Sequence, residues 1–356
     1  MRILVTGACG FVGNRLIGHW IRQGAGHQFV AVDNFVRPGS EMNRQTLREL
    51  GVQVLHGDIR CPSDLETLPE VDAVIDAAAL PSVLAGVDGK SSVRQLLEHN
   101  LNGTANLLEF CRVRGASFIL LSTSRVYGAG VLNQLPMRRE NERFVPAAEA
   151  VPLPGFSAAG VSETFATEAP RSLYGTSKLM SEMLALEYHH AFGMPVWINR
   201  CGVLAGPGQF GHAEQGVFSF WLHAWKSRRP LRYIGFGGQG LQVRDALDPV
   251  DLVPVLDAQL ACQDKMDRRV FNFGGGVTNS MSLRELSDWC RLRLGDHEVL
   301  ADDTDRAFDV PWLVMDSTRA QAVWNWRPKR SLNIILEEIA EFAESHPDWL
   351  DRTSPK

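Results

Sequence analysis

Two side chains in the middle of the sequence stand at a spacing that suits acid–base chemistry. Tyr174 and Lys178 are four residues apart in the segment YGTSK, so on a helix they share one face. A nearby ammonium group lowers the pKa of a phenol, which lets the phenol exchange a proton with a substrate hydroxyl. Thr123 could add a hydroxyl to the same relay. A half-buried tyrosine and a solvated lysine on an amphipathic helix are the alternative interpretation.

The start of the chain could hold a cofactor that carries phosphates. Glycines recur as GxxGxxG in the run from Gly7 through Gly10 to Gly13, between an expected strand and an expected helix. Such glycines bring backbone N–H groups and the helix N-terminus against a pyrophosphate. Asp33 follows at the end of the next expected strand, where a carboxylate binds the ribose hydroxyls of NAD and repels the 2′-phosphate of NADP. The pattern indicates a dinucleotide site that prefers NAD. NADP stays the alternative, because Arg37 is nearby and an arginine can accommodate the 2′-phosphate.

These residues need a sheet that brings the ends of several strands together. Through residue 122, short apolar runs alternate with stretches of helical spacing, which is typical of βαβ units and a parallel sheet. The expected strands cover residues 2–6, 29–32, 53–56, 73–76, 117–122 and 196–200. The expected helices cover residues 11–23, 95–112, 174–191, 282–294 and 332–343. Prolines and glycines predict a long irregular excursion over residues 128–171.

The composition fits a globular protein and narrows the classes of partner. The 356 residues carry 36 basic and 41 acidic side chains, a formal net charge of −5, and 45% are hydrophobic. This length predicts two domains or one large domain with an elaborated lobe. The charge gives no reason to expect nucleic acid or an anionic membrane as the main partner. No segment approaches the roughly 20 apolar residues of a membrane helix, and the N-terminal apolar run is too short for a signal peptide.

The cysteines also bear on the class of protein. Six cysteines are scattered without a CxxC pair or a close set of cysteines and histidines. This spacing indicates neither a zinc site nor a disulfide framework. We therefore expect no metal and a cytoplasmic location, where thiols stay reduced.

Several strings together resemble the extended short-chain dehydrogenase/reductase superfamily, and within it the sugar-nucleotide epimerases and dehydratases. They are GxxGFxG with Asp33, HGDI at 56–59, AAA at 77–79, Asn100, STSRVYG at 122–128, YxxxK and Gly206-Pro207. The resemblance runs over nearly the whole chain. It implies an α/β fold with a Rossmann-like doubly wound parallel sheet that binds NAD in residues 1–200 and about 241–262. It also implies a smaller, discontinuous C-terminal lobe in about 201–240 and 263–350, with a nucleotide-diphosphate sugar as substrate.

The resemblance also assigns roles to individual residues. Thr123, Tyr174 and Lys178 would be catalytic. The cofactor would contact Tyr174 and Lys178 as well as Gly7, Gly10, Phe11, Val12, Gly13, Asp33, Asn34, Asp58, Ile59, Ala77, Ala78, Ala79, Asn100, Ser122 and Cys201. The substrate would contact Ser124, Gln209, Val217, Arg244 and Arg306, with the two arginines on its diphosphate. Extended members commonly form homodimers, which here would pack the helices around residues 95–112 and 176–191.

Two comparisons within the superfamily indicate the expected reaction: a difference from the dehydratases and a resemblance to one group of epimerases. Many dehydratases of the superfamily carry an Asp-Glu pair directly after the catalytic Thr, and Ser124-Arg125 stands there instead, so elimination of water loses its usual acid and base. The strings QGV at 215–217, QVRD at 242–245 and FNFGGG at 271–276 resemble the CDP-paratose (CDP-tyvelose) 2-epimerase group. This resemblance implies NAD-dependent epimerisation at C2 through a transient ketone. A 4-epimerase, a dehydratase, a net oxidoreductase and a cofactor-binding protein without chemistry are the alternatives.

Two further departures concern the substrate. Val203 stands where many relatives place an Asn that touches the substrate phosphates, and Asp76 stands where a His often precedes the small residues. Neither change affects Thr123, Tyr174 or Lys178. They bear on the identity of the substrate more than on the type of reaction.

Overall fold

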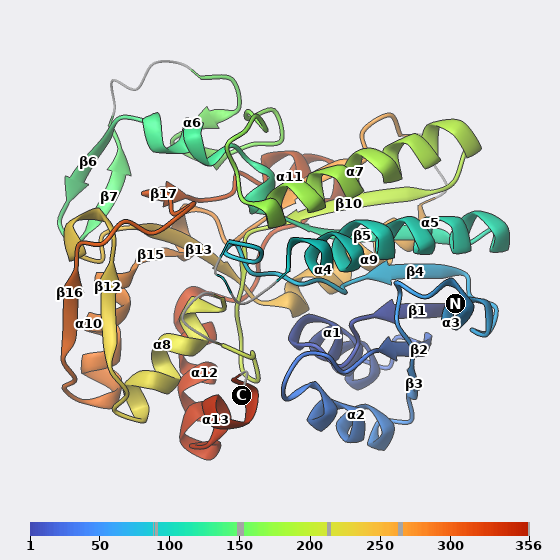
Figure 1. Cartoon of the computed structure of the whole chain (residues 1–356), viewed down its shortest axis with the longest axis horizontal. Coiled ribbons are helices and arrows are strands. Elements are labelled where there is room, and N and C mark those ends of the chain that lie inside the picture. The colour runs from blue at the N-terminus through green and yellow to red at the C-terminus, as the bar shows by residue number, and fades with distance from the viewer. Residues whose placement is uncertain (88, 90–91, 148–152, 212–214, 263–265, 355–356) are drawn as a thin grey trace.

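A seven-stranded parallel sheet forms the centre of the protein (Figure 1), with the strand order β14-β10-β5-β4-β1-β2-β3. The computed structural model describes residues 1–87, 89, 92–147, 153–211, 215–262 and 266–354. The strands are β1 (Arg2–Thr6), β2 (Gln28–Asp33), β3 (Gln53–His56), β4 (Ala73–Asp76), β5 (Ser117–Thr123), β10 (Val196–Cys201) and β14 (Val270–Phe273). The six strands expected from the sequence are therefore confirmed, with ends that differ by one residue at most.

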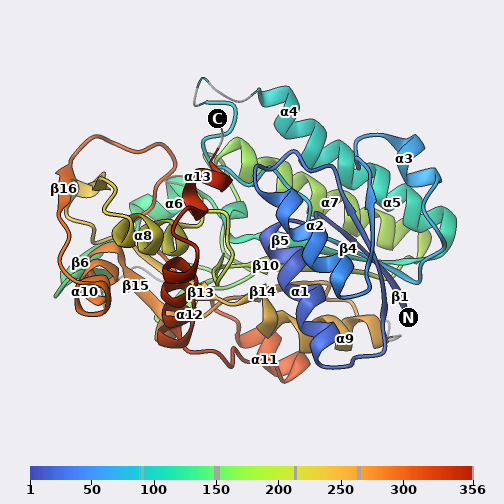
Figure 2. The same ribbon diagram turned by 90° about the horizontal axis from the view of Figure 1, so that it is seen from below.

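Helices cover both faces of this sheet (Figure 2). One face packs against α1 (Phe11–Arg22), α2 (Ser40–Glu49), α9 (Val253–Ala261) and α11 (Thr318–Trp324). The other packs against α3 (Pro62–Glu66), α5 (Gly103–Arg114) and α7 (Leu173–Phe192). Along β1, Ile3 and Val5 enter the first core and Leu4 enters the second, all with no exposed surface. Strands buried on both faces need continuous apolar runs, and the result is the expected Rossmann-like, doubly wound sheet.

A smaller lobe lies beside the carboxyl ends of the central strands (Figure 1). Its sheet contains β11 (Val203–Leu204), β13 (Val243–Leu247), β15 (Ser280–Ser282) and β17 (Trp312–Leu313), and β12 (Leu231–Ile234) pairs with β16 (Val299–Asp302). Its helices are α8 (Val217–Lys226), α10 (Leu283–Leu294), α12 (Leu332–Ser345) and α13 (Trp349–Thr353). Trp221, Trp225, Leu286 and Ile339 belong to its apolar core.

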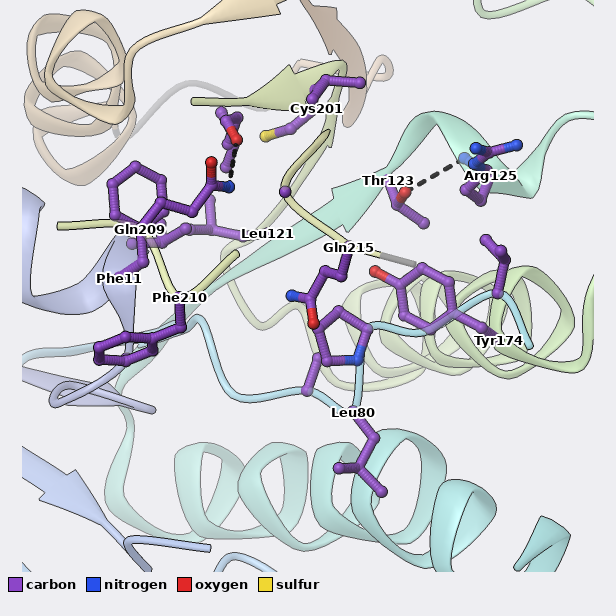
Figure 3. Close-up of a pocket in the computed structure, with 18 of the residues that line it drawn as sticks. Phe11, Leu80, Leu121, Thr123, Arg125, Tyr174, Cys201, Gln209, Phe210 and Gln215 are labelled. Atoms are coloured by element: carbon purple, nitrogen blue, oxygen red, sulfur yellow. Dashed lines mark hydrogen bonds between the residues drawn. The ribbon is translucent and has the colours of Figure 1, made fainter. Parts of the chain in front are cut away.

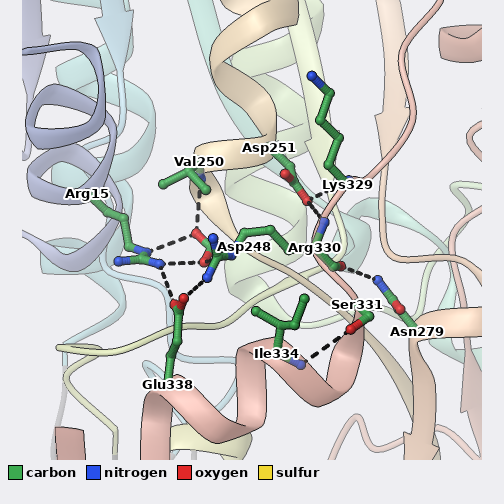
Figure 4. Close-up of polar contacts among 10 residues, drawn as sticks. All are labelled: Arg15, Asp248, Val250, Asp251, Asn279, Lys329, Arg330, Ser331, Ile334 and Glu338. Atoms are coloured by element: carbon green, nitrogen blue, oxygen red, sulfur yellow. Dashed lines mark hydrogen bonds and ion pairs between the residues drawn. The ribbon is translucent and has the colours of Figure 1, made fainter. Parts of the chain in front are cut away.

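A buried charge cluster joins the lobe to the central domain (Figure 4). Asp248, which has no exposed surface, accepts hydrogen bonds from Arg15 of α1 at 2.9 and 2.5 Å. Arg330 lies 3.0 Å from the same carboxylate and also pairs with Glu338 of α12. Removing one partner of such a cluster would leave an uncompensated buried charge, so these residues hold the two parts of the molecule together beside the glycine-rich turn.

Two expectations of regular structure need correction. The single helix expected over residues 95–112 is α4 (Val93–Leu97), a π-helical turn η1 (Glu98–Asn102) and α5. The excursion expected over residues 128–171 contains α6 (Ala129–Gln134), the hairpin of β6 (Met137–Glu140) and β7 (Arg143–Pro146), and the pair β8 (Phe156–Ser157) and β9 (Gly160–Val161). Residues 148–152 of this excursion lie outside the described residues.

Strand membership also differs from the boundaries expected for the two parts of the chain. Residues 263–350 were expected in the lobe, but β14 pairs with β10 in the central sheet. Residues 241–262 were expected in the central domain, but β13 belongs to the sheet of the lobe. The chain crosses between the two parts at these short strands. Within the described ranges, none of the helices combines the length and the apolar character that a membrane span requires.

Candidate active site

A cavity of about 700 Å³ lies where the carboxyl ends of the central strands face the lobe. Ligands of open α/β sheets bind at this edge, where the strand order reverses. Figure 3 shows part of its wall. The wall contains most of the residues that the sequence assigned to the site: Gly7, Gly10, Phe11, Val12, Asp33, Asn34, Ile59, Ala77, Ala78, Ala79, Ser122, Thr123, Ser124, Tyr174, Cys201, Gln209, Val217, Arg244 and Arg306.

The turn after β1 lines the cavity and packs closely against the backbone that follows β4. Gly7 has a φ of +59°, and a Cβ atom on it would lie 2.9 Å from the Cα atom of Ala78. Asp33 accepts hydrogen bonds from the backbone N–H groups of Cys9 and Phe35 at 2.9 and 2.8 Å. Burial raises the pKa of this carboxyl group, and the backbone donors act in the opposite direction. The carboxylate thus braces the turn and also reaches the wall of the cavity.

Several assigned cofactor residues lie behind the wall. Gly13 lies in the first turn of α1. Asp58 accepts a hydrogen bond from Asn34 at 3.1 Å and pairs with Arg60 at 2.6 Å. The side chain of Asn100 accepts from the N–H of Leu80 at 2.8 Å and donates to its carbonyl at 3.1 Å. These side chains shape the residues that line the cavity.

Tyr174 reaches into the cavity from the first turn of α7, close to the end of β5 (Figure 3). Burial raises the pKa of its hydroxyl to about 12, while a hydrogen bond with Thr123 and the charge of Arg125 act in the opposite direction. A Cβ atom on Gly175 would lie 2.1 Å from the carbonyl oxygen of Arg125. Only glycine permits this contact, which sets the tyrosine beside Thr123.

Lys178 is placed one turn further along α7 and is 1% exposed. Burial lowers the pKa of its ammonium group, and the charges of Asp76 and Glu182 act in the opposite direction. Lys178 was assigned to the cofactor as well as to catalysis, and it is not part of the cavity wall described above. Its expected effect on the pKa of Tyr174 stays a prediction.

Arginines assigned to the substrate line part of the cavity wall. Arg244 pairs with Asp309 at 2.6 Å and also donates to the carbonyl of Val243 at 2.7 Å. Burial lowers the pKa of Arg125 to about 10, and the charges of Arg244 and Arg306 act in the same direction. Arg125, Arg244 and Arg306 all line the cavity, and we call this group the positive wall. Guanidinium groups gathered in this way suit a ligand with adjacent phosphate groups.

Two arginines of the cavity were not recognised as site residues in the sequence. In the sequence, Arg125 only replaces an acid of the dehydratases. Its position directly after Thr123-Ser124 was the signal that could have identified it as a site residue. Arg37 donates to the carbonyl of Phe210 at 2.7 Å and to the side chain of Gln215 at 3.1 Å. It thereby ties the segment after β2 to the lobe, and no local pattern could reveal a contact over this sequence distance.

The other assigned wall residues have neutral side chains. Ser122 donates to Glu182 at 2.5 Å, and Gln209 donates to the carbonyl of Leu204 at 2.7 Å. Burial raises the pKa of the Cys201 thiol to about 12, so this thiol is neutral near pH 7. Its role at this position is to pack against the cavity.

Comparisons with known proteins identify the family. The family model described as Epimerase, the NAD dependent epimerase/dehydratase family, matches residues 3–274, and the chain belongs to this family. It is 28% identical to the CDP-paratose 2-epimerase of Salmonella typhi over 97% of this chain and 100% of that protein. It is 24% identical to the UDP-glucuronate 4-epimerase of Thermodesulfobacterium geofontis over 96% of each protein. A crystal structure of dTDP-glucose 4,6-dehydratase from Bacillus anthracis in complex with NAD has a TM-score of 0.76 at 22% identity, over 99% of this chain and 100% of that one.

NAD is the cofactor of this family, and the residues present fit it. Gly7 and Gly10 bring backbone without side chains to the cavity wall, and Asp33 stands at the end of β2 in the same wall. The expected NAD dependence and the Rossmann-like fold are thus confirmed.

We expect the protein to bind NAD more tightly than NADP, because the charge of Asp33 repels a 2′-phosphate. Calorimetric titration of cofactor-stripped protein measures both affinities. In the Asp33→Asn variant, which loses the charge, the ratio of the two affinities should fall. Comparable binding of NAD and NADP by the unmodified protein would contradict the assignment of Asp33.

Proposed function

We propose that the protein is an NAD-dependent epimerase of a nucleotide-diphosphate sugar and that it inverts C2 through a transient ketone. The observation that carries the proposal is that Tyr174 and Thr123 line the same cavity as Arg244 and Arg306. An acid–base pair and a positive wall in one cavity suit a sugar that is joined to a diphosphate. The likeness to CDP-paratose 2-epimerase supports C2, and the likeness to UDP-glucuronate 4-epimerase keeps C4 as the second candidate.

In the proposed reaction, Tyr174 takes the proton from the sugar hydroxyl as the carbon becomes a ketone, and it later returns the proton to the same oxygen when hydride comes back to the opposite face of that carbon. Thr123 hydrogen-bonds the same oxygen and orients it. NAD, when bound by the turn at Gly7 and by Asp33, supplies hydride acceptance and return. Arg244 and Arg306 hold the diphosphate while the sugar turns, so the two faces of one carbon are presented in succession.

Arg125 favours epimerisation over elimination of water. Its guanidinium stands in the cavity at a place where dehydratases carry an acid, and it donates to the carbonyl of Phe308 at 3.3 Å. A guanidinium is always protonated near pH 7 and has no acceptor. It therefore cannot remove a proton from the sugar, which supports an epimerase.

The test is incubation with a panel of CDP-, UDP-, GDP- and dTDP-sugars in deuterated water, followed by NMR. An epimer that keeps its carbon-bound hydrogen supports the proposal, and the position of the inverted carbon decides between C2 and C4. Lasting absorbance of NADH would indicate a net oxidoreductase. Loss of water from the sugar would indicate a dehydratase.

We also propose that the protein forms a homodimer through α5 and α7. These neighbouring helices expose large apolar side chains: Val113 is 68% exposed, Met183 60% and Phe192 57%. Light scattering at micromolar concentration should give twice the mass of one chain, and Met183→Glu should shift the protein toward the monomer. Leu292→Glu on α10, where the side chain is 90% exposed, is the matched control and should leave the mass unchanged. A monomer in the unmodified protein would contradict the proposal.

A further inference from the structure

Arg37 joins the central domain to the lobe at the cavity wall. It is the fourth residue after β2, and the same wall contains Phe210 and Gln215 of the lobe (Figure 3). The Nη2 atom of Arg37 donates to the carbonyl oxygen of Phe210 at 2.7 Å, and its Nη1 atom donates to Oε1 of Gln215 at 3.1 Å. Both terminal nitrogens of the guanidinium group are therefore engaged by the lobe. We call these two hydrogen bonds the Arg37 bridge.

Both ends of the Arg37 bridge are anchored. The carbonyl oxygen of Arg37 accepts hydrogen bonds from the hydroxyl and the N–H of Ser40 at 2.7 and 3.0 Å, at the start of α2. On the other side, Phe210 is 4% exposed and stacks on Trp349 of α13, with 5.6 Å between the ring centroids. The indole N–H of Trp349 donates to the carbonyl oxygen of Gln209 at 2.9 Å. The bridge thus connects two segments that are each held by their own part of the molecule.

The same segment of the lobe also contacts the central domain beside the glycine turn. A Cβ atom on Gly206 would lie 3.4 Å from the Cζ atom of Phe11, at the start of α1. Residues 206–210 therefore reach from the start of α1 to Arg37. In folds of this class the pyrophosphate binds at the helix N-terminus after the glycine turn, and a ribose binds the acid that ends the second strand, here Asp33. The segment thus meets the central domain on both sides of the place expected for the adenosine half of the dinucleotide.

We propose that Arg37 retains NAD in the protein by holding residues 206–210 and Gln215 over the adenosine half of the bound cofactor. Release and entry of the cofactor then require the Arg37 bridge to break. The inference rests on NAD as the cofactor of this family and is independent of the sugar and of the inverted carbon. It gives Arg37 a role other than the contact with a 2′-phosphate that would admit NADP.

The Arg37→Ala variant tests the bridge through the rates of cofactor exchange. Stopped-flow fluorescence follows NADH as it leaves the loaded protein into an excess of NAD, and as it binds to cofactor-stripped protein. A hydrogen bond from a charged donor is worth at least about a factor of ten, so loss of both bonds should speed release at least about tenfold. Since entry requires the same bridge to break, binding should also become faster, and Kd should change less than either rate.

Gln215→Leu is the second variant, because it removes one bond of the Arg37 bridge and keeps Arg37 itself. It should speed release by a smaller factor, and it keeps the test decisive if Arg37→Ala does not fold. Arg48→Ala is the matched control. Its side chain is exposed on α2, and its replacement should leave both rates unchanged.

Three outcomes would overturn the inference. Unchanged release of NADH from both bridge variants would show that the bridge does not retain the cofactor. Faster release with unchanged entry in Arg37→Ala would mean that Arg37 contacts the cofactor itself. A selective loss of affinity for NADP would assign Arg37 to the 2′-phosphate. Failure of the whole panel of nucleotide sugars would contradict the proposed function alone, because these rates are measured without a sugar.

Discussion

Replacing Tyr174 with Phe should lower turnover of the true substrate by roughly 10²–10⁴-fold, the usual contribution of a general acid–base group. Tyr174 is 7% exposed and is held beside Thr123 by the contact between Gly175 and Arg125. The change removes one oxygen atom from this packed position and leaves the ring. Affinities for NAD and for the nucleotide sugar should therefore stay nearly constant. Steady-state kinetics and calorimetry on the same preparation measure both effects.

Tyr127→Phe is the matched control for this substitution. Tyr127 is also buried, at 1% exposed; it donates to Asn272 at 2.7 Å and lies outside the wall of the large cavity. Loss of its hydroxyl should reduce stability by about 0.5–1.5 kcal/mol, with turnover close to that of the unmodified protein. If Tyr174→Phe retained near-normal turnover, another group would have to transfer the proton, and the mechanism proposed above would be wrong.

The central strands could be predicted because their cause is local. Residues 2–6 and 73–76 are short, mostly apolar runs that are buried on both faces, and the observed strands have the same bounds. The edge strand at residues 53–56 also keeps its expected bounds, although only Val54 in it is buried. The glycine turn and the pairing of Tyr174 with Lys178 are also local patterns. Those features of the site were visible in the sequence because a few neighbouring residues produce them.

The excursion over residues 128–171 could not be predicted in the same way. The N–H of Phe144 donates to the carbonyl of Leu241, and Arg143 pairs with Glu285. The N–H of Val161 likewise donates to the carbonyl of Val314. These short strands depend on partners far along the chain, and the local prolines and glycines indicate only where regular structure stops.

The features of the site that the sequence did not predict also depend on contacts between distant parts of the chain. Family resemblance assigned Asn100 to the cofactor, while the structure has its side chain on Leu80 and Ser177. Arg37 and Arg125 are held in the cavity wall by hydrogen bonds to the carbonyls of Phe210 and Phe308, which are far away in the sequence. The charge of the cavity depends on side chains from several distant segments, so it cannot be predicted from any one of these segments alone.

Substitution of the cavity arginines should weaken binding of the nucleotide sugar at least about tenfold. A charged hydrogen bond contributes about 1.5–3 kcal/mol, and about 1.4 kcal/mol corresponds to a factor of ten. Arg244→Ala should have the larger effect, because it also leaves Asp309, now paired with Arg244 at 2.6 Å, facing the diphosphate. Adding Asp309→Asn to Arg244→Ala should recover part of the affinity. Arg306→Ala should weaken binding without this recovery.

The affinity for NAD separates this prediction from a general loss of structure. Arg244 and Arg306 belong to the lobe, whereas the glycine turn belongs to the central domain. Calorimetry should therefore show nearly unchanged NAD binding in both variants. Arg232→Ala is the control: this side chain is 54% exposed, pairs with Asp302 only at 3.8 Å and should leave both affinities unchanged. If Arg244→Ala and Arg306→Ala left substrate affinity untouched, or damaged NAD binding equally, the positive wall would not bind a diphosphate. The substrate would then belong to a different chemical class.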